Sequence, residues 1–66
     1  MKYHLMLILH YDETGDDHVI IERVEPLTLS KAMRVARSWI KLEKRLNRKY
    51  KRPQPIKFII KLTERA

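Results

Sequence analysis

The chain of 66 residues contains no cysteine and only one glycine, Gly15. The lack of cysteine excludes disulfides, thiolate metal sites and thiol nucleophiles, and it fits a reducing compartment. One glycine cannot build a loop that cradles phosphates. A domain this small buries only about 60% of the surface that its unfolded chain exposes. We therefore expect oligomerisation to support the thin core.

Long hydrophobic runs are also missing. The apolar stretch at residues 5–9 follows a single lysine and is too short for a signal peptide or a membrane span. The sequence thus predicts one cytoplasmic domain, residues 1–66.

Signatures of catalysis are absent as well. Ser30 and Ser38 have no histidine and acid arranged in a triad pattern. The carboxylates between residues 12 and 17 cluster in one turn, where nothing raises a pKa for acid–base work. We therefore expect a protein that is not an enzyme and that needs no cofactor.

The three histidines make a poor metal site. His4 and His10 lie six residues apart, which is about 20 Å along a strand, so they cannot share one ion. His10 and His18 meet only if a hairpin adopts one particular register, and they then form a loose site at most. We predict no metal ligand.

Alternation of apolar residues predicts two strands, residues 2–11 and 18–24, joined by a turn at residues 12–17. Gly15 can take the positive φ that a tight hairpin needs. Both a two-residue turn and a three-residue loop with a bulge fit this segment. One choice puts His10 opposite His18, and the other puts it opposite Val19.

A long helix follows. Pro26 ends the second strand, Thr28 is suited to cap a helix, and the helix runs from Leu29 to about Tyr50. One side of this helix is apolar: Leu29, Ala32, Met33, Val35, Ala36, Trp39, Ile40, Leu42, Leu46 and Tyr50. Two prolines then break the chain before a third strand at residues 56–62.

These elements predict an α+β domain of order β-β-α-β. A right-handed crossover gives a three-stranded antiparallel sheet of order 2-1-3, with the helix on one face. The odd-numbered residues of the first strand are the better partners for the helix. The other face is apolar enough to suggest a homodimer, and its expected interface residues are His4, Met6, Ile8, His10 and Ile59.

Positive charge is concentrated in the helix. Residues 31–52 hold ten Lys or Arg and one acid, Glu43, which gives +9; the whole chain is +7, so the remainder is −2. A solvated helix face usually mixes both signs, and like charges at this spacing repel. The face therefore suggests a polyanionic partner, and the candidate nucleic-acid-binding residues are Arg34, Arg37, Lys41, Lys44, Arg45, Arg48 and Arg52.

Three functions fit this pattern. The first is an accessory protein that binds DNA or RNA through phosphates with low sequence specificity. The second is a protein-binding module, an inhibitor or adaptor, that docks on an acidic surface of a larger assembly. In the third, basic helices and acidic turns pair between copies of the chain. Solubility alone also accounts for the charge.

Overall fold

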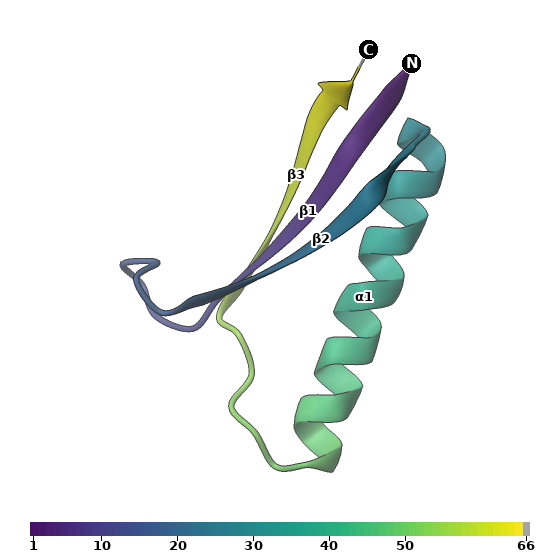
Figure 1. Cartoon of the computed structure of the whole chain (residues 1–66). Coiled ribbons are helices and arrows are strands. Elements are labelled where there is room, and N and C mark those ends of the chain that lie inside the picture. The colour runs from purple at the N-terminus through teal and green to yellow at the C-terminus, as the bar shows by residue number, and fades with distance from the viewer. Residues whose placement is uncertain (66) are drawn as a thin grey trace.

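The computed structural model describes residues 1–65 and contains three strands and one helix. These are β1 (Lys2–His10), β2 (His18–Leu27), α1 (Leu29–Lys49) and β3 (Lys57–Arg65). The strands form one antiparallel sheet of order β2-β1-β3, and α1 packs on one face of it (Figure 1). The α+β fold and the strand order predicted from the sequence are confirmed.

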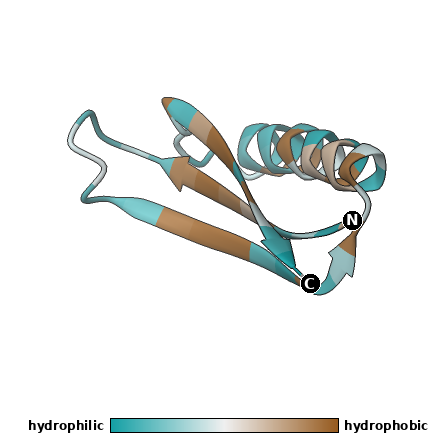
Figure 2. Ribbon diagram, turned by 90° about the horizontal axis from the view of Figure 1, so that it is seen from above, coloured by the Kyte–Doolittle hydropathy of each residue, from teal (hydrophilic) through white to brown (hydrophobic). Residues whose placement is uncertain are grey.

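The core lies between β1 and α1. Leu5, Leu7 and Leu9 point to the same face of β1 and are completely buried. Leu5 packs with Leu27 of β2 against Ala32 and Ala36 of the helix, and such small side chains let the helix backbone approach the sheet closely. Figure 2 shows α1 lying along one side of the sheet, with hydrophobic residues in the middle of the strands. The expected pairing of the odd face of β1 with the helix is therefore observed.

The hairpin adopts one of the two expected registers. His10 pairs with His18, and the connection spans residues 11–17. The Tyr11 amide donates to the Asp17 carbonyl at 2.8 Å, and Gly15 has a φ of 82°. The loop is thus longer than a two- or three-residue turn, although it uses the glycine as expected.

Two predicted strand ends are wrong. Pro26 does not end β2, which continues to the buried Leu27. The register of β2 against β1 shifts on the way, between Tyr3 and Leu5 of β1. An edge strand tolerates proline because its outer side needs no amide donor. Likewise β3 extends to Arg65 rather than ending at Leu62, because it follows β1 along its whole length.

Both ends of α1 have caps. The Thr28 hydroxyl accepts a hydrogen bond from the Lys31 amide at 3.4 Å, as predicted. At the other end, Lys51 has a φ of 53°, and the amides of Lys51 and Arg52 donate to the carbonyls of Arg48 and Asn47. This is the Schellman pattern, in which a left-handed residue ends the helix.

The apolar side of α1 is wider than the surface that the sheet covers. Leu29 is 51% exposed, Leu42 48% and Tyr50 61%, so these three residues of the apolar side are not part of the core. Asn47 is buried instead, at 2% exposure, and its Nδ2 has no hydrogen-bond partner within residues 1–65. Leu42 lies on the flank of the helix away from Asn47, whereas Leu29 and Tyr50 are exposed because they lie at its two ends.

Replacing Leu7 with alanine tests the core. We expect Leu7→Ala to lower the free energy of unfolding by about 2–5 kcal/mol, because the change leaves a cavity beneath α1. Leu42→Ala removes the same atoms from a half-exposed site and should cost about 1 kcal/mol or less. Urea denaturation followed by circular dichroism measures both values, and equal losses would contradict this description of the core.

Candidate functional site

Seven Lys and Arg side chains form the basic face, along the side of α1 and of its C-terminal turn that points away from the sheet. Lys44 lies at the edge of this face, with its Nζ 5.5 Å from the centroid of the Phe58 ring of β3. Because Ala32 and Ala36 face the sheet, residues half a turn away face outward. All seven are exposed, and they are Arg34, Arg37, Lys41, Lys44, Arg45, Arg48 and Arg52. The structure thus brings together every residue predicted for nucleic-acid binding.

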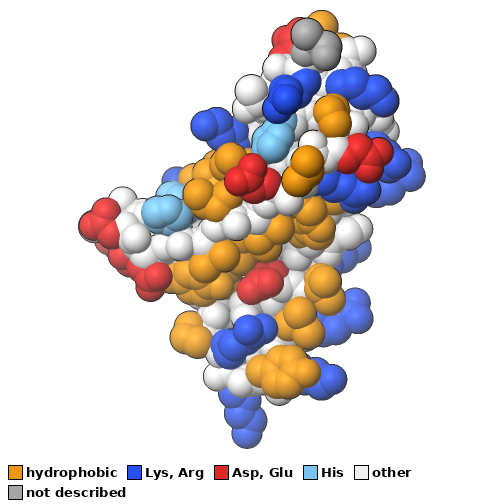
Figure 3. Space-filling model, viewed as in Figure 1, with side chains coloured by type: hydrophobic (Ala, Val, Ile, Leu, Met, Phe, Trp, Pro, Cys, Tyr) orange, Lys and Arg blue, Asp and Glu red, His pale blue; other side chains and the backbone are white. Residues whose placement is uncertain are grey.

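No carboxylate among the described residues neutralises the basic face. The ion pairs found within residues 1–65 join His4 to Glu22 and Arg23 to Glu25, at 3.0 and 3.6 Å. Glu43 is part-buried and lies about 20° around the helix from Ala32, on the side of the sheet. Glu43 therefore does not interrupt the basic face. Figure 3 shows Lys and Arg side chains along the helix, and Asp and Glu side chains both at the hairpin tip and singly over the rest of the visible surface.

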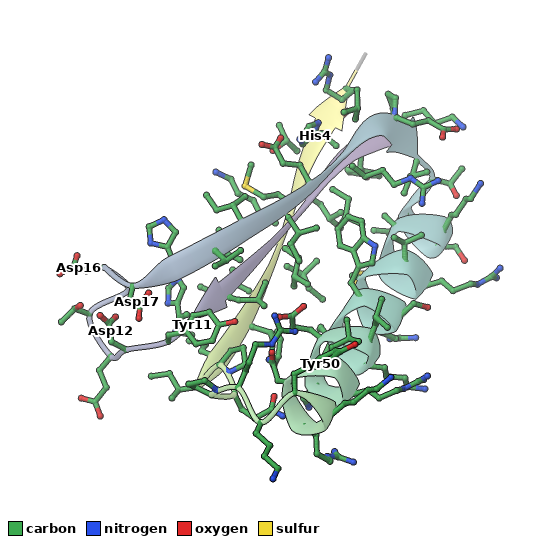
Figure 4. All side chains as sticks on the ribbon, turned by 60° about the horizontal axis from the view of Figure 1, so that its bottom comes forward. His4, Tyr11, Asp12, Asp16, Asp17 and Tyr50 are labelled. Atoms are coloured by element: carbon green, nitrogen blue, oxygen red, sulfur yellow. The ribbon has the colours of Figure 1, made fainter. Side chains whose placement is uncertain are left out.

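An exposed aromatic ring lies at the end of the basic face. Tyr50 caps the last turn of α1 (Figure 4), with Lys49 Nζ 5.5 Å and the Arg52 guanidinium carbon 5.7 Å from its ring centroid. At 61% exposure, this ring does not close the core. The sequence pattern places Tyr50 on the apolar side of the helix, and the cations that follow and precede it in the sequence are the signal that agrees with its exposure. Cations at these distances are attracted to the ring face.

Lys51 places a further charge beside Tyr50 at a cost in backbone energy. Its φ of 53° lies in the left-handed region, where a side chain is disfavoured by about 1 kcal/mol and glycine is not. The Schellman cap would form equally well with glycine.

The hairpin tip is the acidic pole of the molecule. The Asp12 carboxylate accepts hydrogen bonds from the amides of Gly15 and Asp17, at 2.7 and 3.1 Å, and from the Thr14 hydroxyl at 3.1 Å. Partial desolvation acts to raise the pKa of Asp12, but these hydrogen bonds outweigh it and lower the pKa below its ordinary value. Asp16 and Asp17 lie in the same loop (Figure 4).

The histidines of the hairpin lie close together without forming a metal centre. The rings of His10 and His18 are 6.2 Å apart, and His18 Nδ1 donates to the Gly15 carbonyl at 2.7 Å. Over residues 1–65, no three histidine or acidic side chains group closely enough to hold a metal ion, and no cavity is found.

The residues predicted for a dimer interface lie on the face of the sheet opposite α1. His4, Met6, Ile8 and His10 alternate along β1, and Ile59 of β3 pairs with Ile8. All five are part-buried. The structure therefore places them on one surface, which we call the open face.

Comparison of the chain with protein-family models, curated proteins and solved structures gives no match. No helix within residues 1–65 is both long and apolar enough to cross a bilayer.

Acidification tests the role of Asp12. Its pKa is lower in the folded protein than in the unfolded chain, so the ionised carboxylate stabilises the fold above the unfolded value, near pH 4. This contribution disappears as the pH falls through the folded value. As the pH falls below about 4, we expect the free energy of unfolding to decrease less for Asp12→Ala than for the wild type. Asp16→Ala takes a carboxylate from the same loop but none of these hydrogen bonds, and is the matched control.

Lys51→Gly tests the helix cap. Since glycine adopts a positive φ without strain, we expect this change to raise the free energy of unfolding by about 1 kcal/mol. Lys49→Gly removes the same charge inside the last helical turn and should lower stability by about 1 kcal/mol. Thermal denaturation of both variants gives the comparison. A Lys51→Gly protein no more stable than wild type would show that the left-handed turn is not strained.

Proposed function

We propose that this protein is a non-enzymatic nucleic-acid-binding protein that contacts phosphates through its basic face and has little sequence specificity. The single observation that supports this is the set of seven exposed cations without carboxylate partners on one side of α1. Polyphosphate backbones bind such surfaces by releasing their condensed counterions.

The length of the basic face suits a phosphate backbone. From Arg34 to Arg48 the helix rises by about 21 Å. Duplex DNA has one negative charge per about 1.7 Å of its axis, so several phosphates lie within that span. Arg34, Arg37 and Arg48 also offer the two-donor fork that fits a phosphate group.

The make-up of the basic face favours nucleic acid over an acidic protein surface. Protein interfaces depend on buried aromatic and arginine anchors at their centre, and the centre of this face contains no aromatic residue. Its one exposed aromatic, Tyr50, lies at the edge between two cations, a position from which a ring can stack on an unpaired base. No element presents side chains suited to reading base edges, which is why we propose low specificity.

Salt dependence is the first test of this proposal. If six residues of the basic face contact duplex phosphates, the logarithm of the binding constant should fall with the logarithm of salt concentration at a slope near −5. Fluorescence anisotropy of labelled duplex DNA and single-stranded RNA, at about 50 to 200 mM salt, measures this slope. Absence of binding at low salt would overturn the proposal and leave the acidic protein surface as the partner to seek.

A pair of triple variants locates the contact. Arg37, Lys41 and Arg48 changed together to glutamine remove three charges from the centre of the basic face, and glutamine keeps the helix propensity. We expect the slope to become shallower by about 3. Lys2, Lys57 and Arg65 changed to glutamine remove the same charge from β1 and β3. If both triple variants lose affinity equally, net charge rather than the basic face determines binding.

A further inference from the structure

Three cross-strand rows make up the middle of the open face. In each row one residue of β2 and one of β3 flank a residue of β1 and point to the same side of the sheet. The rows are His18–His10–Lys57, Ile20–Ile8–Ile59 and Glu22–Met6–Lys61. Figure 2 shows no element on this side of the sheet.

The apolar part of the open face is incompletely covered. Ile20 is 46% exposed, while Ile8, Ile59 and Met6 are part-buried by their neighbours alone. Burial of these side chains would stabilise the protein by about 25 cal/mol for each Å² of apolar surface removed from water. A domain of this size gains much from such burial, because its single core is thin.

The row of Glu22, Met6 and Lys61 has opposite charges at its two ends. Glu22 lies on the β2 edge and Lys61 on the β3 edge, and both are exposed. His4 Nε2 lies 3.0 Å from Glu22 Oε2 and holds that carboxylate on the open face. The surface is therefore negative on one edge and positive on the other at the same height along the strands.

We propose that the open face binds a second copy of this chain, with a twofold axis parallel to β1 between the two sheets. That axis places β2 of each copy over β3 of the other and β1 over β1. Glu22 of each copy then faces Lys61 of its partner, Ile20 faces Ile59, and Met6 and Ile8 meet their own counterparts. The charge pattern of a single chain is thus complementary to itself, which is what an isologous dimer requires.

The other face-to-face arrangement is unfavourable. A twofold axis across the strands puts β3 over β3 and brings Lys57 and Lys61 of both copies together, so like charges repel. The parallel axis avoids this contact. It keeps the strands of the two sheets nearly aligned, as in aligned sheet packings, in which the sheets lie about 10 Å apart. It also leaves both α1 helices on the outside, so the basic faces point away from the interface and from each other.

Charge reversal across the interface tests this arrangement. We expect Glu22→Lys and Lys61→Glu each to weaken dimerisation at least tenfold, because each places two pairs of like charges in contact. The double variant restores opposite charges at both positions and should recover dimerisation to within a few fold of wild type. Sedimentation equilibrium over a range of protein concentrations measures the dissociation constants, and circular dichroism shows whether each variant is folded.

Net charge alone gives a different result. Glu22→Lys raises the formal charge from +7 to +9, and Lys61→Glu lowers it to +5, so general repulsion would weaken one dimer and strengthen the other. Glu64→Lys and Lys31→Glu make the same changes outside the open face and should leave dimerisation within a few fold of wild type. A wild-type protein that stays monomeric at all concentrations, or a double variant that does not recover, would overturn the proposed dimer. Since no nucleic acid is present, this outcome is independent of the proposed function.

Discussion

The whole structure depends on covering one face of β1. This strand pairs with a neighbour on both edges, and its Leu5, Leu7 and Leu9 side chains need an apolar cover. Within residues 1–65, α1 is the element that covers this face. Ala32 and Ala36, which pack with Leu5, are small enough to let α1 lie close to the strand. Once those two alanines face the sheet, the helical period turns the basic residues outward.

The sequence predicts the parts of the fold that local signals determine. Thr28 caps a helix because its own hydroxyl reaches a nearby amide, and the alternation in β1 shows which leucines share a face. The period of one helix defines the basic face from Arg34 to Arg48, whereas Arg52 follows the left-handed turn that ends the helix. The expected end of the second strand at Pro26 was wrong, and the burial of Asn47 was not predicted, for another reason. Whether an edge strand continues through a proline, or which flank of a helix the sheet covers, depends on tertiary contacts between distant segments.

The open face and the basic face lie on opposite sides of the sheet–helix pair. Contacts made by Met6, Ile8 and Ile59 are separated from Arg37 and Arg48 by both layers of the domain. Self-association and binding of a polyanion would therefore not compete for the same surface. A dimer built on the open face would present two basic faces in opposite directions, which allows one assembly to hold two segments of a polyanion.

The separation of the acidic hairpin tip from the basic helix gives the molecule a large electric dipole. Four carboxylates occupy residues 12–17 and a net +9 occupies residues 31–52. In Figure 1 the hairpin tip lies at the left and the helix at the right. Near any strongly negative surface this dipole produces a torque that turns α1 towards that surface and the hairpin away from it. The torque acts within about one Debye length, near 8–10 Å at physiological salt. An encounter with such a surface would begin with α1 facing it, which removes part of the orientational search that limits protein association rates.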